Sequence, residues 1–104
     1  MTKSDIFSIL ASKTIAHISD QIEDQDDSGI IDVDYLGDIL KLLTSRGEYV
    51  INKHSAAKEI WLASPISGPY HFHHYNSRWV NKNGVELLSL LEQELSQFVN
   101  IKLQ

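Results

Sequence analysis

Eight carboxylates and no lysine or arginine lie between Thr14 and Leu40, and oxygen atoms gathered in this way have the chemistry of a cation site. The eight acids are Asp20, Glu23, Asp24, Asp26, Asp27, Asp32, Asp34 and Asp38. Carboxylate oxygens suit hard cations such as Ca²⁺, Mg²⁺, Mn²⁺ or Fe²⁺. The first acids lie where a helix is predicted to end. Each exposed carboxylate there destabilises the helix by roughly 0.3–1 kcal/mol, because it lies near the negative end of the helix dipole. We therefore expect a bound cation or a basic partner here, and the alternative is a solvated acidic surface.

The spacing of these acids places most of them on one continuous ridge. Asp20, Glu23, Asp24 and Asp27 are separated by three, four and seven residues, which puts them on one helix face. Each pair of like charges at these spacings destabilises a helix by roughly a few tenths of a kcal/mol. Asp32 and Asp34 share one face of a following strand, and Asp26 lies at the junction, whereas Asp38 falls in a turn. We name the first seven acids the acidic ridge and predict them as metal ligands: Asp20, Glu23, Asp24, Asp26, Asp27, Asp32 and Asp34.

The segment from Asp24 to Tyr35 also resembles a calcium-binding EF-hand loop. Loop positions 1, 3, 5, 6, 8 and 9 fit the pattern, but Tyr35 at position 12 stands where the loop needs a bidentate glutamate. No second loop of this kind follows in the sequence. A single EF-hand-like calcium module is therefore kept as an alternative function.

A tryptophan in the middle of the chain is a candidate binding residue. In the stretch 59–63, strand alternation points Ile60 and Leu62 to one side and Trp61 to the other. By the same alternation Asn52 would share the face of Trp61. An exposed tryptophan beside an asparagine is typical of a protein interface, since tryptophan anchors binding hot spots. Alternation leaves a second interpretation open, in which Trp61 is part of the core.

Histidines cluster in the second half of the chain, but no catalytic set is visible. His71, His73 and His74 lie near one strand, where His71 and His73 could share a face and bind a metal, and His17 lies one helical turn before Asp20. Each is interpreted as an ordinary surface residue. The sequence has no nucleophile–base–orienter set, no glycine-rich phosphate loop and no HExxH motif. We therefore expect a binding protein and not an enzyme.

The elements that position these residues follow from periodicity. A helix is predicted over 2–23, with Thr2 and Asp5 as a capping box and an apolar stripe on its inner face at Ile6, Phe7, Leu10, Ala11, Thr14, Ile18 and Ile22. Strands are predicted at 31–35, 39–43, 48–53, 59–64, 70–75 and 78–81, with a turn at 46–47 and a loop at 65–69. A second helix is predicted to open at Asn83, with Leu88, Leu91, Leu95 and Phe98 as its apolar face. The order predicts an α+β fold, a two-layer sandwich with both helices on one face of an antiparallel sheet.

Composition narrows the class of protein. The 104 residues are enough for one domain, over 1–104, and the hydrophobic fraction of 42% is that of a soluble globular protein. The formal net charge of −5 argues against nucleic acid, which needs clustered lysine and arginine. The absence of cysteine excludes disulfides and thiolate ligation of a metal or cluster by this chain. We see no membrane span and no secretory signal, so we expect the cytoplasm.

Two motifs resemble those of the frataxin family, and the length and start resemble its bacterial CyaY branch. They are Tyr-Val-Ile-Asn-Lys-His at 49–54 and Ile-Trp-Leu-Ala-Ser-Pro-Ile-Ser-Gly-Pro at 60–69, and a third segment with a family counterpart runs from Trp79 to Leu95. The resemblance covers nearly the whole chain. It implies two helices on an antiparallel sheet and weak iron binding, as Fe²⁺ or Fe³⁺, on the acidic ridge. It also implies binding to the cysteine desulfurase and scaffold complex that builds iron–sulfur clusters.

The resemblance also assigns roles to particular residues, and at a few positions the sequence differs from the family pattern. Asp20, Glu23, Asp24, Asp26, Asp32 and Asp34 match the family's acidic ridge, and Asn52 and Trp61 match its partner-binding residues on the sheet. The departures are Ser19, Ile30 and His54, together with His71, His73 and His74 after the glycine–proline step. We expect an iron-binding regulator or iron donor, monomeric or oligomerising with iron. The enzymatic alternative is a ferroxidase or iron-storage activity on paired carboxylates.

Overall fold

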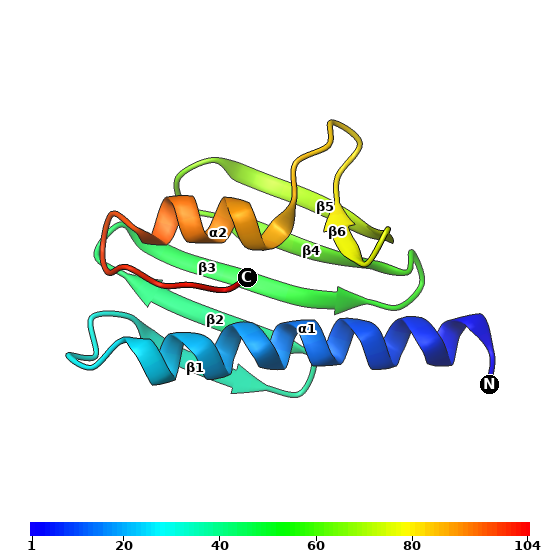
Figure 1. Cartoon of the computed structure of the whole chain (residues 1–104), viewed down its shortest axis with the longest axis horizontal. Helices are drawn as coiled ribbons and strands as arrows, with labels where there is room; N and C mark the ends of the chain where they lie inside the picture. Colours follow the sequence, from blue (N-terminus) through cyan, green and yellow to red (C-terminus); the bar gives the residue numbers. More distant parts are fainter.

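Six antiparallel strands form one sheet in chain order, and two helices cover one of its faces (Figure 1). The computed structural model describes residues 1–104. The elements, in order, are α1 Lys3–Gln25, β1 Asp32–Leu36, β2 Ile39–Thr44, β3 Gly47–His54, β4 Glu59–Ser64, β5 Gly68–Tyr75, β6 Arg78–Val80 and α2 Leu87–Leu95. One cluster of 19 buried hydrophobic residues fills the space between the layers. The predicted α+β sandwich is therefore confirmed. No helix is both long and apolar enough to span a membrane.

Helix α1 begins as predicted and ends two residues later. Thr2 is its N-cap, and the capping box with Asp5 is formed in both directions. These hydrogen bonds, led by the one from the backbone of Thr2, lower the pKa of Asp5. The predicted apolar stripe needs correction, because Ile6 is exposed whereas Ile15 is completely buried. Steps of four rotate about 40° further round the helix each time, since 3.6 residues make a turn. The buried stripe therefore alternates steps of three and four through Phe7, Ala11, Ile15, Ile18 and Ile22.

Helix α2 is shorter than predicted, and it starts at Leu87 instead of Asn83. Asn81 forms the preceding turn, since its Oδ1 accepts the backbone N–H groups of Asn83 and Val85. Glu86 is itself the N-cap, and its carboxylate accepts the N–H groups of Leu88 and Ser89. This shift rotates the buried face to Leu87, Leu91 and Leu95, while Leu88 is half-buried and Phe98 lies beyond the helix.

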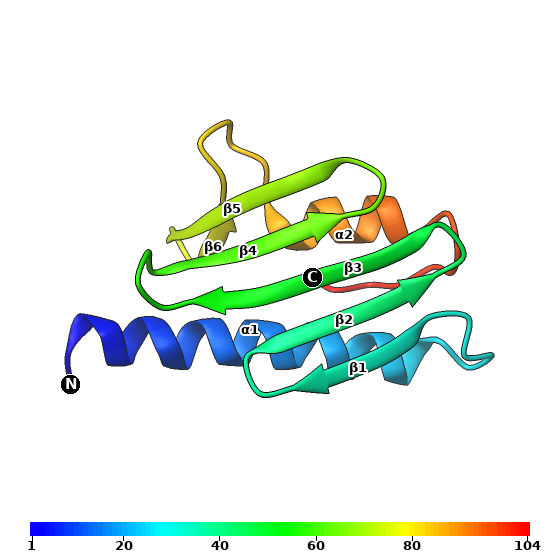
Figure 2. The ribbon, with the colours of Figure 1, turned by 180° about the vertical axis from the view of Figure 1, so that it is seen from behind.

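The side chains of the sheet alternate between a core face, which packs on the helices, and an open face. Figure 2 views the sheet from its open side, with the helices behind it. Tyr49, Ile51, Ile60 and Leu62 are buried against the helices, as the alternation predicts. One row on the open face runs across five paired strands through Leu36, Ile39, Asn52, Trp61 and His71. Asn52 is the direct cross-strand partner of Trp61. The predicted shared face of these two residues is therefore confirmed.

A buried carboxylate from α2 fixes the loop between β4 and β5. Glu94 accepts hydrogen bonds from the hydroxyl groups of Tyr49, Ser64 and Ser67. Ser64 Oγ in turn accepts the backbone N–H groups of Ile66 and Ser67. Burial, followed by the bond to Glu94, raises the pKa of Tyr49. The loop that turns the chain into β5 is thus held to helix α2, which stabilises the pairing of β5 with β4.

The last residues of the chain run between the two helices (Figure 1). Ile101 and Leu103 are buried in the core. The backbone of this segment is held by side chains of both helices: Gln25 pairs with both backbone groups of Lys102, His17 Nε2 lies 2.6 Å from the carbonyl oxygen of Leu103, and Glu92 accepts the N–H of Leu103. The segment therefore closes the space that two helices alone leave open over the sheet.

Candidate functional site

The acidic ridge follows the end of α1, the turn after it and the edge strand β1. Asp20, Glu23 and Asp24 lie on the last turns of the helix, Asp27 lies on the turn, and all four are exposed. Asp32 and Asp34 are exposed on β1. No basic residue lies in the last turn of α1. Six of the seven predicted ligands are thus exposed along α1, the turn and the edge strand β1, and the register places Asp32 and Asp34 on the open face of the sheet.

Asp26 differs from the rest of the ridge because its carboxylate is already occupied. The residue is 8% exposed and caps the end of α1. Its Oδ1 accepts the backbone N–H of Ile30 at 3.0 Å, and its Oδ2 accepts that of Ile31 at 2.8 Å. Gly29 completes the turn with a φ of 65°, a conformation that glycine adopts without strain. The contacts of Asp26 therefore close the turn between α1 and β1.

The ridge is electrostatically uncompensated. The one ion pair in the structure joins Lys53 and Asp38, and no ridge carboxylate takes part in it. Lys41 is the nearest cation by register, since it is the cross-strand partner of Asp34, but the two form no ion pair. No three histidine, aspartate or glutamate side chains lie close enough together to enclose a metal ion. The ridge is an open row of ligands, not a closed cage.

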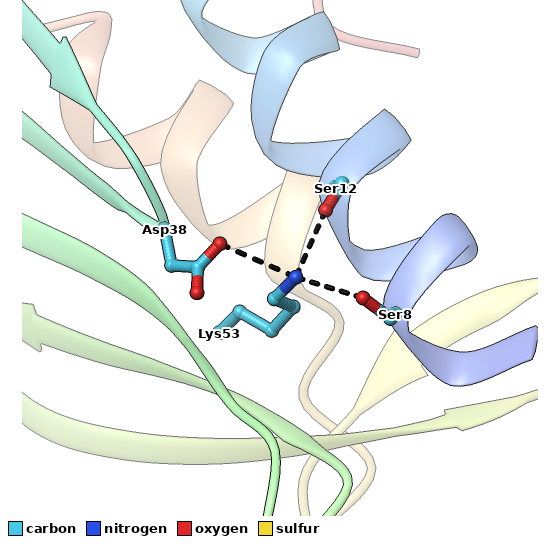
Figure 3. A network of polar contacts seen from close by, with 4 residues as sticks. All are labelled: Ser8, Ser12, Asp38 and Lys53. Carbon is cyan, nitrogen blue, oxygen red and sulfur yellow. Dashed lines mark hydrogen bonds and ion pairs between the residues drawn. The ribbon is translucent and has the colours of Figure 1, made fainter. Parts of the chain in front are cut away.

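Asp38 falls in the β1–β2 turn as predicted, and its carboxylate contacts the partly buried Lys53 (Figure 3). Lys53 Nζ lies 3.2 Å from Asp38 Oδ1 and donates to the hydroxyl groups of Ser8 at 2.8 Å and Ser12 at 3.2 Å. The backbone N–H of Lys53 also donates to the carbonyl oxygen of Asp38. All three ammonium donors are satisfied, so this contact ties α1 to the sheet beyond the ridge.

The geometry does not match an EF-hand. The segment leads from helix α1 directly into strand β1, whereas an EF-hand loop is followed by a second helix. The carboxylate of Asp26 at the third loop position is turned onto backbone N–H groups. The structure therefore contradicts the EF-hand alternative, because the segment is not a helix–loop–helix.

Trp61 lies half-buried on the open face, clamped between two imidazole rings. The ring of His54 stacks on it with centroids 3.7 Å apart, and His71 stacks on the other side at 4.1 Å. The indole Nε1–H donates to Glu59 Oε1 at 2.9 Å. This answers the question that alternation left open, because Trp61 is on the face away from the core. The stack holds the indole in one orientation, with its outer edge available to a partner.

The sequence interpretation missed this stack, since it treated the histidines as separate surface residues. The signal lies in the strand register, which pairs His71 with Trp61. His73 shares the face of His71 by alternation, whereas His74 packs edge-on against Trp79 with centroids 5.0 Å apart. The three histidines after the glycine–proline step therefore do not form one cluster.

Comparison with known proteins identifies the class. A family model described as the frataxin-like domain matches residues 1–101, and the chain belongs to the frataxin family. Among curated proteins, mitochondrial frataxin of Arabidopsis thaliana is 37% identical over 94% of this chain and 56% of its own length. The mitochondrial frataxin homolog of Saccharomyces cerevisiae is 35% identical over 86% of this chain and 55% of its own length. The chain thus spans little more than half the length of these relatives.

Solved structures agree with the fold. Frataxin of Psychromonas ingrahamii, described as a member of the CyaY protein family, superimposes with a TM-score of 0.85 over 99% of both chains at 22% identity. Trimeric yeast frataxin complexed with ferrous iron superimposes with a TM-score of 0.80 at 35% identity, over 86% of this chain and 85% of that chain. The predicted frataxin fold, with two helices on an antiparallel sheet, is confirmed.

Proposed function

We propose that this protein binds iron on the acidic ridge and acts as a regulator or iron donor in iron–sulfur cluster assembly. The observation that carries the proposal is a row of six exposed carboxylates without any cationic partner. The solved yeast relative complexed with ferrous iron supports the same choice of ion. The ligands we propose are Asp20, Glu23, Asp24, Asp27, Asp32 and Asp34, and Asp26 supports them by holding the turn.

The open geometry of the ridge favours weak and exchangeable binding. Since no three ligands enclose one point, each ion would be held by one or two carboxylates and would keep part of its water shell. Such sites release their ion easily, because few protein–metal bonds must break. This behaviour suits a protein that passes on or senses iron. It suits a permanent metal cofactor poorly.

The proposed partners are a cysteine desulfurase and an iron–sulfur scaffold protein. The ridge would attract a basic surface of the desulfurase by electrostatic steering. Trp61 and Asn52 would provide the contacts of the sheet face, since they are neighbours there and Trp61 is held in one orientation. The chain has no cysteine with which to hold a cluster itself, so the scaffold must be another protein. We further propose a cytoplasmic monomer that oligomerises only with iron.

Replacing Trp61 by alanine tests the partner surface. We expect Trp61→Ala to weaken binding to the desulfurase complex by about 2 kcal/mol, roughly 30-fold, with a small effect on stability. Isothermal titration calorimetry measures the affinity, and urea unfolding measures the stability. Tyr75→Ala is a matched control, because Tyr75 is an exposed aromatic residue at the end of β5. Unchanged affinity of the Trp61 variant, or an equal loss in the control, would refute this surface.

A ferroxidase remains the enzymatic alternative, because Asp20 is three residues from Glu23 and four from Asp24, spacings that pair side chains on a helix, and all three are exposed. Steady oxidation of Fe²⁺ by the monomer, abolished by Glu23→Gln with Asp24→Asn, would favour it. Stoichiometric binding of Fe²⁺ without turnover favours the regulator or donor.

A further inference from the structure

A second, basic site lies on the helical side of the molecule, where α1, the β5–β6 hairpin and the start of α2 meet. A hollow of about 590 Å³ opens here. Its apolar floor is formed by Leu10, Trp79 and Leu88, and its rim carries Lys13, His17, His74, Ser77 and Arg78. We call this hollow the basic groove. Its volume falls within the roughly 300–1,000 Å³ of small-molecule sites.

The floor of the basic groove is rigid. Trp79 is 4% exposed, and its indole N–H donates to Thr14 Oγ1 at 2.9 Å. The hydroxyl of Thr14 in turn donates to the carbonyl oxygen of Leu10 at 3.0 Å. Phe7 packs edge-on against the indole from below, with ring centroids 5.9 Å apart. The shape of the hollow is therefore largely formed before any ligand arrives.

The one acidic side chain of the groove lining is already used by the protein. The carboxylate of Glu86 accepts the N–H groups of Leu88 and Ser89 and the hydroxyl of Ser89. Two other lining residues donate to the protein, since Gln104 Nε2 donates to Ser89 and Glu92 and His17 Nε2 donates to the carbonyl oxygen of Leu103. The negative charge of Glu86 is therefore held by the start of α2.

The groove carries two cations without an ionic partner. Lys13 and Arg78 form no ion pair, since the one ion pair of the structure lies at Lys53. Ser77 and Arg78 reach the rim through the two-residue turn between β5 and β6, in which Asn76 has a φ of 50° and Ser77 a φ of 62°. Positive φ at both positions is the conformation that a two-residue hairpin turn requires, so the hairpin fixes where Arg78 begins. Unpaired cations over an apolar floor are the chemistry of an anion site.

We propose that the basic groove binds a small multivalent oxyanion, with phosphate or carboxylate groups held by Lys13 and Arg78 and its remainder lying against Leu10 and Leu88, beside the buried Trp79. The guanidinium of Arg78 suits two oxygens of one group, while the ammonium of Lys13 suits a second group. The groove is built on the middle of α1, from Leu10 to His17, whereas the acidic ridge begins at Asp20 and continues to β1. The groove therefore adds an anion to the proposed cation chemistry of the molecule.

Titration with inorganic pyrophosphate and with citrate, each on metal-free protein at constant ionic strength, tests this proposal. In a Trp61→Phe variant, Trp79 is the one remaining tryptophan, so its fluorescence and its indole N–H signal in NMR report on the groove. We expect at least one probe to shift both signals saturably below about 10 mM. Binding of pyrophosphate alone would assign phosphate ligands, and binding of citrate alone would assign carboxylate ligands.

Charge variants separate a built site from general attraction. Lys13→Gln with Arg78→Gln should lower the affinity for the probe by about tenfold or more, because both charge-assisted contacts are lost. Lys41→Gln with Arg46→Gln removes the same charge far from the groove and should change the affinity less than about twofold. No saturable shift with either probe, or an equal loss in the control, would overturn the proposal.

Discussion

Two neighbouring aspartates, Asp26 and Asp27, show how differently two carboxylates of one segment can act. Asp26 is buried and accepts two backbone N–H groups, whereas Asp27 is exposed. The sequence pattern put both on the ridge, because spacing shows which side chains can share a face and not which of them bond to the backbone. The same limit applied to His54 and His71, whose contact with Trp61 depends on how three strands pair.

The contrast between the two aspartates predicts their mutants. Asp26→Asn places an amide group where two backbone donors need acceptors, and we expect a loss of about 1–3 kcal/mol in the free energy of unfolding. Asp27→Asn should change it by less than about 0.5 kcal/mol, as for a surface substitution. Urea unfolding of both variants measures the difference. Equal stabilities would show that the carboxylate of Asp26 does not hold the turn.

At the scale of elements, the strands were the most predictable part of the fold. β3 and β4 are rich in Tyr, Val, Ile and Trp, and the predicted range 59–64 is that of β4 itself. The start of α2 was missed because Glu86 can serve either as the third residue of a helix or as its N-cap, and tertiary contacts decide between the two. The path of the last residues between the helices has no local signal, since it depends on contacts between distant parts of the chain.

The docking of the last residues should depend on pH through Glu92. The N–H of Leu103, followed by that of Gln104, lowers the pKa of Glu92 below its ordinary value of 4.5, although burial acts in the opposite direction. A carboxylate with a lowered folded-state pKa stabilises the fold above its ordinary value and loses this effect as the pH falls through the folded-state value. We therefore expect the segment to loosen as the pH falls below 4.5 and through the lowered pKa of Glu92.

The protection factor of the Leu103 amide, which is its exchange rate relative to an unfolded chain at the same pH, measures this loosening at pH 7 and in acid. Glu92→Gln should lower the protection factor already at pH 7 and show little further change with acid. Glu48→Gln is a control, because Glu48 is exposed on β3. If acid lowers the protection factor equally in the wild type and in the Glu92 variant, Glu92 does not control the segment.

At the scale of the whole molecule, charge is distributed unevenly along α1. Carboxylates gather at its C-terminal end and on β1, while Lys13, Arg78 and two histidines gather at the basic groove beside its middle turns. Of these two sites the acidic one was predictable, because its residues are close in sequence. The basic one was not, since the fold collects its residues from positions 10 to 104.

The crowding of negative charge should make the folded protein sensitive to divalent cations. We expect saturating Mn²⁺ to raise the melting temperature by several degrees, roughly the effect of 1 kcal/mol in a domain of this size. The double substitution Asp20→Asn with Asp24→Asn should raise the melting temperature of the metal-free protein, because it relieves repulsion between carboxylates. The same variant should gain less melting temperature on addition of Mn²⁺ than the wild type does. Calorimetry measures both changes. If the double variant melts at a lower temperature than the wild type, or gains as much from Mn²⁺ as the wild type does, the ridge carboxylates do not repel each other as we expect.

The most direct test of iron binding on the ridge is an NMR titration of the protein with Fe²⁺ under anaerobic conditions. A bound paramagnetic ion broadens the amide signals around it, so the spectrum maps its position. We predict broadening centred on residues 20–34, with the amides of β4 and β5 unaffected. Broadening centred on His71 and His73, or no selective broadening, would contradict the account.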